Sequence, residues 1–300
     1  MTILVSGLIN IETTLKVDGF PIKYNPVNYP FFGVNSTVSG VGYNIAKALT
    51  VLGNHVHFMS LIGQDNAAQT VKIALQQEGI PDQYVLQLLE KTPQSVIIYD
   101  PSGRRQIHVD LKDVQERTYP LEIYAEAVRD CSIVVLCNIN FSRSFLAQAK
   151  QAGKIVATDV HTIADLEDDY NRDYMAHADI LFMSHEALPC PPHEWIKQVQ
   201  NRFENDIVVI GLGADGVQLG VKKDHFNERI PAVKVREVIN TIGAGDALFS
   251  AFIHDYHKTR DPYTAIRKAI VFAAHKIGSA GAAEGFVSED VLESLYEHFS

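Results

Sequence analysis

The sequence predicts a doubly wound α/β fold, in which a mostly parallel β-sheet carries helices on both faces. From about residue 120 onward, short apolar runs at 133–136, 155–157, 180–183 and 207–210 alternate with helical or loop segments. Apolar runs of this length indicate parallel strands whose two faces are both covered. Of the 300 residues, 46% are hydrophobic, and no repeat or linker divides the chain. We therefore expect a single domain spanning residues 1–300.

Elements at both ends of the chain fit the same plan. Residues 3–5 predict a strand, a helix follows with Ile45, Ala48 and Leu49 on one face, and residues 55–62 predict the next strand. A second helix is expected at 67–78. The last helical block covers 246–299 and is interrupted by a Gly/Ala-rich turn at 278–285.

Two segments do not fit the alternation of strand and helix. Residues 11–37 are rich in Pro, Gly, Asn and aromatic residues, and residues 95–110 predict a hairpin. Together they predict a small β lid over the carboxyl ends of the parallel strands, where such sheets bind ligands. Aromatic residues in or beside this lid either stack on a ligand or, as we favour, pack the lid's own core: Tyr24, Tyr29, Phe31, Phe32 and Tyr43.

Composition excludes several classes of partner. The formal net charge is −10, which disfavours nucleic acids and anionic membranes. No apolar run approaches the ~20 residues of a membrane span. Cys131, Cys137 and Cys190 lack the spacing of a zinc site and fit a reduced compartment, so we expect a cytoplasmic protein.

Residues 240–252 are the most informative segment. Gly243, Ala244 and Gly245 precede Asp246 at the start of a predicted helix, so backbone N–H groups and the helix dipole would form a site for a phosphoryl group. Asp246 would take the proton of an attacking hydroxyl, with its pKa held down by the helix N-terminus. The alternative is that Asp246 only caps the helix.

Residues 240–253 resemble the C-terminal signature of the ribokinase/PfkB carbohydrate kinase family. The segment from Ser39 to Ala46, followed by Gly53 and Gly63, resembles the family's N-terminal glycine motif, with Ser39 as the one departure. The resemblance implies a ribokinase-like fold. It also implies that Asp246 is the catalytic base and that the backbone of Gly243, Ala244 and Gly245 forms the anion hole for the γ-phosphate.

The same resemblance implies an acceptor site. The segment Gly7 to Glu12 is similar to the family's Gly-x-x-Asn-x-Asp, with Glu12 in place of Asp. The implied acceptor-binding residues are Asn10, Glu12, Gly40, Gly42 and Asn44. The alternatives are that Glu12 is an exposed residue at a strand end and that the glycines only make a tight turn into the helix.

For the nucleotide, the glycines at 211, 213 and 216 match Gly-x-Gly-x-x-Gly, yet the strand-like residues that follow argue against a dinucleotide fold. The resemblance implies instead that this loop binds ATP phosphates. The expected nucleotide-binding residues are Ser184, Gly211, Gly213, Gly216, Thr241 and Ala273.

The implied Mg²⁺ site departs from the family. Ser184 and Ala187 stand where the family has Asn and Glu, so Glu186 or Asp159 would have to assist the metal. The alternative for Asp159 is a turn former at the end of its strand.

We expect an ATP- and Mg²⁺-dependent kinase that phosphorylates a hydroxymethyl group of a sugar or sugar-like molecule, and that forms a homodimer through the lid. The alternatives are a nucleoside kinase on the same fold and a catalytically retired ligand-binding relative. The departure around Ser184 favours the retired relative, and the intact Gly243–Asp246 segment argues against it.

Overall fold

The computed structural model describes residues 2–102, 104–279 and 281–299. Within these residues the main sheet has nine strands in the order β13-β12-β11-β10-β9-β8-β1-β4-β5. All neighbouring strands pair in parallel except at one edge, where β11 with β12 and β12 with β13 are antiparallel. The predicted mostly parallel sheet is therefore confirmed. The strands are β1 (Thr2–Ser6), β4 (His55–Ile62), β5 (Val85–Gln87), β8 (Cys131–Leu136), β9 (Ile155–Thr162), β10 (Ile180–Ser184), β11 (Ile207–Gly211), β12 (Val217–Val221) and β13 (Phe226–Ile230).

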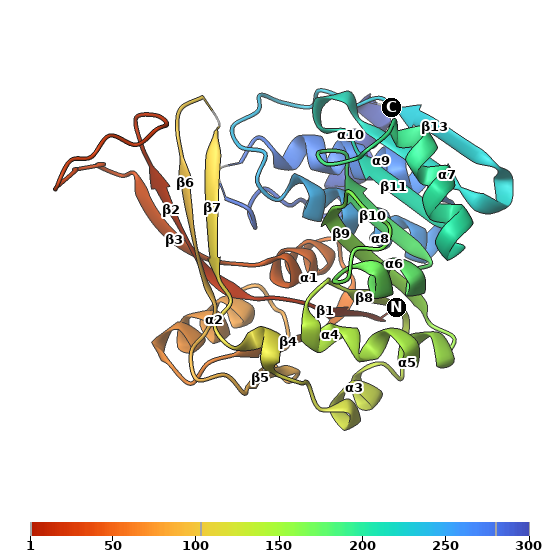
Figure 1. Cartoon of the computed structure of the whole chain (residues 1–300), viewed down its shortest axis with the longest axis horizontal. Coiled ribbons are helices and arrows are strands. Elements are labelled where there is room, and N and C mark those ends of the chain that lie inside the picture. Colours follow the sequence, from red (N-terminus) through yellow and green to blue (C-terminus); the bar gives the residue numbers. More distant parts are fainter. Residues whose placement is uncertain (1, 103, 280, 300) are drawn as a thin grey trace.

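Helices cover both faces of this sheet (Figure 1). One face packs against α1 (Val41–Val51), α2 (Asn66–Gln77), α8 (Ala244–Thr259), α9 (Pro262–Lys276) and α10 (Glu289–Phe299). The other face packs against α3 (Leu121–Ala127), α4 (Asn140–Arg143), α5 (Phe145–Gln151), α6 (Arg172–His177) and α7 (Pro192–Phe203). Successive residues of one strand serve the two cores, since Ile3 and Val5 lie in the first core and Leu4 in the second.

A second sheet stands beside the main body (Figure 1). Its order is β3-β2-β6-β7, formed by β2 (Asn10–Lys16), β3 (Val34–Ser39), β6 (Gln94–Tyr99) and β7 (Arg105–Asp110). Strands β6 and β7 form the predicted hairpin, and β6 pairs in parallel with β2. In the first lid segment only residues 10–16 and 34–39 are strands. Residues 17–33 between them form a long loop at the far end of the small sheet.

The interpretation of the lid aromatics as a small core is wrong. Tyr24, Tyr29, Phe31 and Phe32 retain between 75% and 108% of their full exposure, because the loop that carries them extends into solvent. Tyr43 is buried, but it lies on α1 in the core of the main body.

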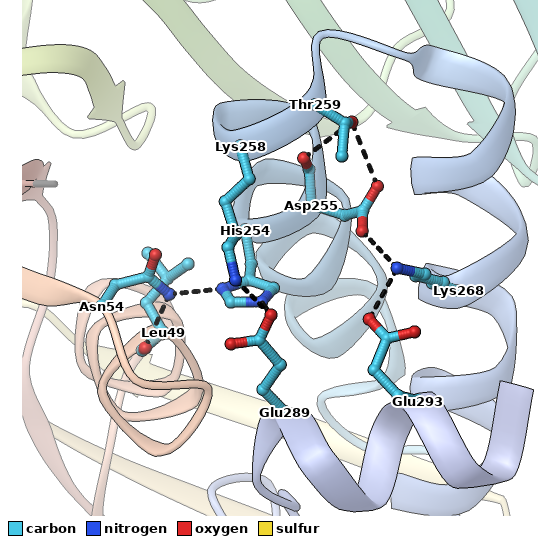
Figure 2. A network of polar contacts seen from close by, with 9 residues as sticks. All are labelled: Leu49, Asn54, His254, Asp255, Lys258, Thr259, Lys268, Glu289 and Glu293. Carbon is cyan, nitrogen blue, oxygen red and sulfur yellow. Dashed lines mark hydrogen bonds and ion pairs between the residues drawn. The ribbon is translucent and has the colours of Figure 1, made fainter.

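Charged pairs connect the three C-terminal helices (Figure 2). Lys268 on α9 donates to Asp255 of α8 at 2.7 Å and to Glu293 of α10 at 2.6 Å. Glu289 of α10 pairs with both His254 and Lys258 of α8. These contacts hold α8, α9 and α10 together. None of the helices described here is long and apolar enough to cross a membrane.

Candidate active site

Asp246 lies in the first turn of α8 and is only 9% exposed. In the described part of the chain its carboxylate does not cap the helix, since the N-cap residue is Gly243 and no side chain caps that end. Instead, Asp246 Oδ2 accepts a hydrogen bond from Asn44 Nδ2 at 2.7 Å. The interpretation of Asp246 as a simple helix cap is therefore wrong. Asn44 on α1 holds a buried carboxylate.

Burial raises the pKa of Asp246 above its usual value. The hydrogen bond from Asn44 and the nearby His161 and Lys276 lower this pKa, but they do not offset the loss of hydration. The expectation that the helix N-terminus would hold the pKa down is therefore wrong. A raised pKa makes Asp246 a stronger base for a hydroxyl proton than an exposed aspartate would be.

The loop before Asp246 is tightly held. Gly243 has a φ of 75°, and a Cβ at this position would lie 2.5 Å from the Ala282 carbonyl oxygen. The Ala244 N–H donates to the Thr241 carbonyl at 3.2 Å. The first N–H groups of a helix lack partners within the helix, so Gly243 and Gly245 are the better donors for a bound anion than Ala244. The loop thus fits the predicted anion hole, with Ala244 contributing less than its neighbours.

The acceptor residues come from the small sheet and α1. Asn10 and Glu12 lie on β2 and are 4% and 7% exposed, so the interpretation of Glu12 as an exposed strand-end residue is wrong. Burial raises the pKa of Glu12, with Asp246 raising it further and Ser39 and Lys276 lowering it. Asn10 Nδ2 donates to Ser95, whereas its buried Oδ1 has no partner among the described residues. An acceptor hydroxyl would satisfy that oxygen.

Gly40 and Gly42 allow the start of α1 to approach the loop after β1. A Cβ at Gly42 would lie 2.4 Å from the Gly7 carbonyl carbon, and one at Gly40 would lie 2.6 Å from the Leu8 oxygen. Gly40 also has a φ of 107°. These contacts fit the alternative of a tight turn into the helix. They also place Asn44 beside Asp246.

The predicted nucleotide residues lie on several elements. Ser184 pairs with Gly211 across β10 and β11, so the two lie side by side at the carboxyl edge of the sheet. Residues 213–215 form a 3₁₀ turn, and β12 returns antiparallel to β11, which confirms that no helix follows this glycine loop. Gly216 has a φ of 93° in this turn. Thr241 is exposed in the loop before α8, and Ala273 is half-buried on α9.

Asp159 lies three residues before the end of β9 at Thr162, and its side chain bonds the backbone two residues on, where His161 has a φ of 58°, so the alternative of a turn former near the strand end is confirmed. Its Oδ1 accepts from the His161 N–H at 2.8 Å, and its Oδ2 faces Gly245. Glu186 is exposed in the turn after β10. No group of three or more His, Cys, Asp or Glu among the described residues could hold a metal alone. Because Mg²⁺ at phosphates takes one or two carboxylates and several waters, Asp159 fits such a site.

Two basic residues lie beside the site, and sequence reasoning missed one of them, Lys276. Arg105 on β7 donates to Thr241 Oγ1 at 3.2 Å and so joins the small sheet to the loop before α8. Lys276 is fully buried at the end of α9, and it affects the pKa of both Asp246 and Glu12. A signal for Lys276 was available, since the spacing Ala265, Ala269, Phe272 and 276 follows the buried face of a helix.

A model of the pfkB family of carbohydrate kinases matches residues 2–289. The chain belongs to the pfkB family of carbohydrate kinases. This pfkB kinase is 24% identical over 275 residues to an acarbose 7(IV)-phosphotransferase of Actinoplanes sp., covering 91% of each chain. It is also 24% identical over 305 residues to an ATP-dependent ribose-1-phosphate kinase of Halopiger xanaduensis, covering 99% of each.

Solved structures agree on the fold of this pfkB kinase. The microbiome-derived acarbose kinase Mak1 superimposes with a TM-score of 0.89 at 25% identity, covering 99% of this chain and 98% of that one. A ribokinase from Giardia lamblia superimposes with a TM-score of 0.84 at 18% identity, covering 100% and 99%. The predicted ribokinase-like fold is therefore confirmed. The protein is an enzyme, a phosphotransferase that uses ATP to phosphorylate a sugar or sugar-like small molecule.

Proposed function

We propose that this enzyme transfers the γ-phosphoryl group of ATP to a hydroxymethyl oxygen of its acceptor, with Asp246 as the base. The observation that carries the proposal is the position of Asp246. Its buried carboxylate is held by Asn44 and directly follows the Gly243–Gly245 backbone at the start of α8. A base beside an anion-binding loop is what in-line phosphoryl transfer to a hydroxyl requires.

Each residue of the site has a separate role in this transfer. Asn44 orients the carboxylate of Asp246, which takes the hydroxyl proton late in the transfer. The N–H groups of Gly243 and Gly245 receive the charge that develops on the migrating phosphoryl oxygens. Arg105, through Thr241, links the small sheet to this loop. Closure of the small sheet as a lid would exclude water and so suppress ATP hydrolysis.

We assign the nucleotide to the edge formed by Ser184, Gly211, Gly213 and Gly216, with Thr241 and Ala273 flanking it. Mg²⁺ bound there would neutralise charge on the ATP phosphates. Asp159 would hold it through bound water, with Glu186 from the next loop. The inward-facing Oδ2 of Asp159 beside Gly245 supports this assignment.

The assay that tests the function measures ADP release with ATP and Mg²⁺ across monosaccharides, sugar phosphates, oligosaccharides and nucleosides. We expect one sugar-like acceptor to raise ADP release well above the rate without acceptor. Turnover restricted to nucleosides would instead make this a nucleoside kinase. Tight binding of a ligand with no turnover on any acceptor would indicate the retired relative.

Glu12→Gln tests the acceptor site. We expect the acceptor KM to rise roughly tenfold with a smaller change in kcat, because a charged hydrogen-bond acceptor for the sugar hydroxyls is lost. Thr13→Val is the matched control, since Thr13 is the next residue on β2 and bonds Ser36 on the other face of the small sheet. An unchanged acceptor KM in Glu12→Gln would remove Glu12 from the acceptor site.

We propose further that the exposed aromatic loop pairs with a second copy of this chain, so that the lid forms a homodimer in the cytoplasm. Four aromatic side chains that protrude from one loop support an interface, because monomers rarely expose such patches. The double variant Phe31→Ser, Phe32→Ser should sediment as a monomer, whereas Ile73→Ser, at an exposed apolar position on α2, should sediment like the wild type. A wild-type protein that is monomeric at all concentrations would contradict this proposal.

A further inference from the structure

Lys276 is a buried cation beside the active site with no role yet assigned in the proposed phosphoryl transfer. It lies at the last position of α9, and its side chain is fully buried. Its Nζ donates a hydrogen bond to the carbonyl oxygen of Ile242, the residue directly before Gly243. A buried ammonium group therefore touches the loop proposed to bind the transferred phosphate.

Burying the charge of Lys276 lowers the stability of the folded protein. An ammonium group carries three N–H donors and no acceptor, and burial removes its hydration. A methionine would fill a similar volume without this cost, so packing alone does not explain a lysine here. Three carboxylates attract the ammonium group, those of Asp246 on α8, Glu284 in the turn after α9 and Glu12 on β2, while Arg105 on β7 repels it. Two of these carboxylates belong to the proposed site, Asp246 as the base and Glu12 as an acceptor-binding residue.

The geometry of the peptide bond connects Lys276 to the anion hole. In a trans peptide the carbonyl and the following N–H lie in one plane and point in opposite directions. Lys276 holds the Ile242 carbonyl toward itself, so the Gly243 N–H of the same peptide must point away from Lys276. The preceding residues are fixed to the same helix end, since the N–H groups of Ile239 and Asn240 both donate to the Ile277 carbonyl. Contact with α9 therefore sets the direction of an anion-hole donor.

We propose that Lys276 is a positioning residue for phosphoryl transfer, an internal cation that orients the Gly243 peptide and supplies fixed positive charge to the site. This inference rests on the proposed function, because it assigns the Gly243–Gly245 loop to the migrating phosphate. Fixed donors and charges of this kind lower a barrier because they need no reorganisation during the reaction. The ammonium group also favours the ionised form of Asp246, the form that acts as base.

The pH dependence of kcat should show the deprotonation of Lys276. Burial lowers the pKa of Lys276 to about 8, even though Asp246, Glu284 and Glu12 raise it. We therefore expect wild-type kcat to fall as pH rises above about 8, where the ammonium loses its proton. In Lys276→Met this alkaline decrease should disappear. The acidic decrease should move to higher pH, because the pKa of Asp246 rises once its positive neighbour is gone.

The experiment compares Lys276→Met with Lys268→Met. Lys268 lies on the same helix and is also charged and paired, but its partners Asp255 and Glu293 lie outside the active site (Figure 2). We expect Lys276→Met to lower kcat roughly a hundredfold, as removal of one oxyanion donor does, with little change in acceptor KM. Lys268→Met should lose stability but keep the wild-type kcat and pH profile.

In Lys276→Ala, ammonium chloride should restore part of the lost kcat, and tetramethylammonium chloride at equal ionic strength should not.

A second readout separates this proposal from the proposed function. Inorganic phosphate is titrated into wild type and Lys276→Met while the backbone amide signals of Gly243 and Gly245 are followed by NMR. We expect these signals to shift in the wild type and phosphate to bind at least tenfold more weakly to the variant. A wild type without turnover on any acceptor would defeat the proposed function and leave this comparison intact. Equal phosphate affinity, or a Lys276→Met enzyme with wild-type kcat and pH profile, would overturn the role of Lys276.

Discussion

Asp246→Asn is expected to lower kcat by a factor of roughly a hundred or more, because the amide cannot accept the hydroxyl proton. The amide keeps the size of the carboxylate and its carbonyl can still accept the hydrogen bond from Asn44. Acceptor and ATP should therefore bind with KM values close to those of the wild type. Steady-state kinetics on both substrates measures this separation.

The stability of Asp246→Asn should change in the opposite direction to its activity. Burial raises the pKa of Asp246 in the folded enzyme above its unfolded value, so ionisation at neutral pH costs stability. This cost is absent at pH values below the unfolded pKa of about 4 and grows as pH rises above it. Asp246→Asn should therefore gain stability over the wild type between acidic and neutral pH in urea unfolding.

Asp255→Asn is the matched control for this variant. Asp255 is a second buried acid on α8, but it pairs with Lys268 away from the active site. We expect Asp255→Asn to lose stability, since Lys268 loses a charged partner, and to retain kcat. Activity that survives in Asp246→Asn would exclude Asp246 as the base.

Gly243→Ala is expected to damage both the anion hole and the fold. The new Cβ would force a left-handed backbone, φ 75°, on alanine and would lie 2.5 Å from the Ala282 oxygen. The loop must shift, which moves the donors of the phosphate site. We expect kcat to fall roughly a hundredfold or more and the free energy of unfolding to fall by about 1–3 kcal/mol.

Gly153→Ala separates backbone strain from the loss of the site. Gly153 has nearly the same backbone, φ 65°, but an added Cβ would meet nothing within 4 Å, and the residue lies in the turn before β9. This variant should lose about 1 kcal/mol of stability at unchanged kcat, because only the left-handed strain remains. Equal kinetics in Gly243→Ala and the wild type would show that the loop does not bind the phosphate.

The main sheet could be predicted because its signal is local. Apolar runs such as 133–136 and 207–210 are long enough for a strand and too short for a helix, and they became β8 and β11. Positions whose exposure depends on distant packing could not be predicted in this way. Phe31 and Phe32 are residues of the kind that form a small core, yet among the described residues they remain 84% and 108% exposed.

In the candidate site, too, features set by neighbouring residues could be predicted from the sequence, whereas features set by distant residues could not. Gly243 at the start of a helix is visible in sequence, and the structure places it at the N-cap of α8. The raised pKa of Asp246 is not visible in sequence, because it depends on burial and on side chains from α1, β9 and α9 that only the fold brings together. Lys276 was missed because its contact with Ile242 spans 34 residues of sequence. Only its helical spacing indicated that a charged side chain would be buried.

The most direct test of the central claim follows the phosphate itself. Wild-type enzyme is incubated with ATP, Mg²⁺ and the acceptor that most increases ADP release, and the products are identified by ³¹P NMR. We predict that phosphorylated acceptor appears in step with ADP, that its phosphate is bonded to a hydroxymethyl oxygen, and that Asp246→Asn forms it at least about a hundredfold more slowly. ADP accompanied by inorganic phosphate, at the same rate with and without acceptor, would contradict the account.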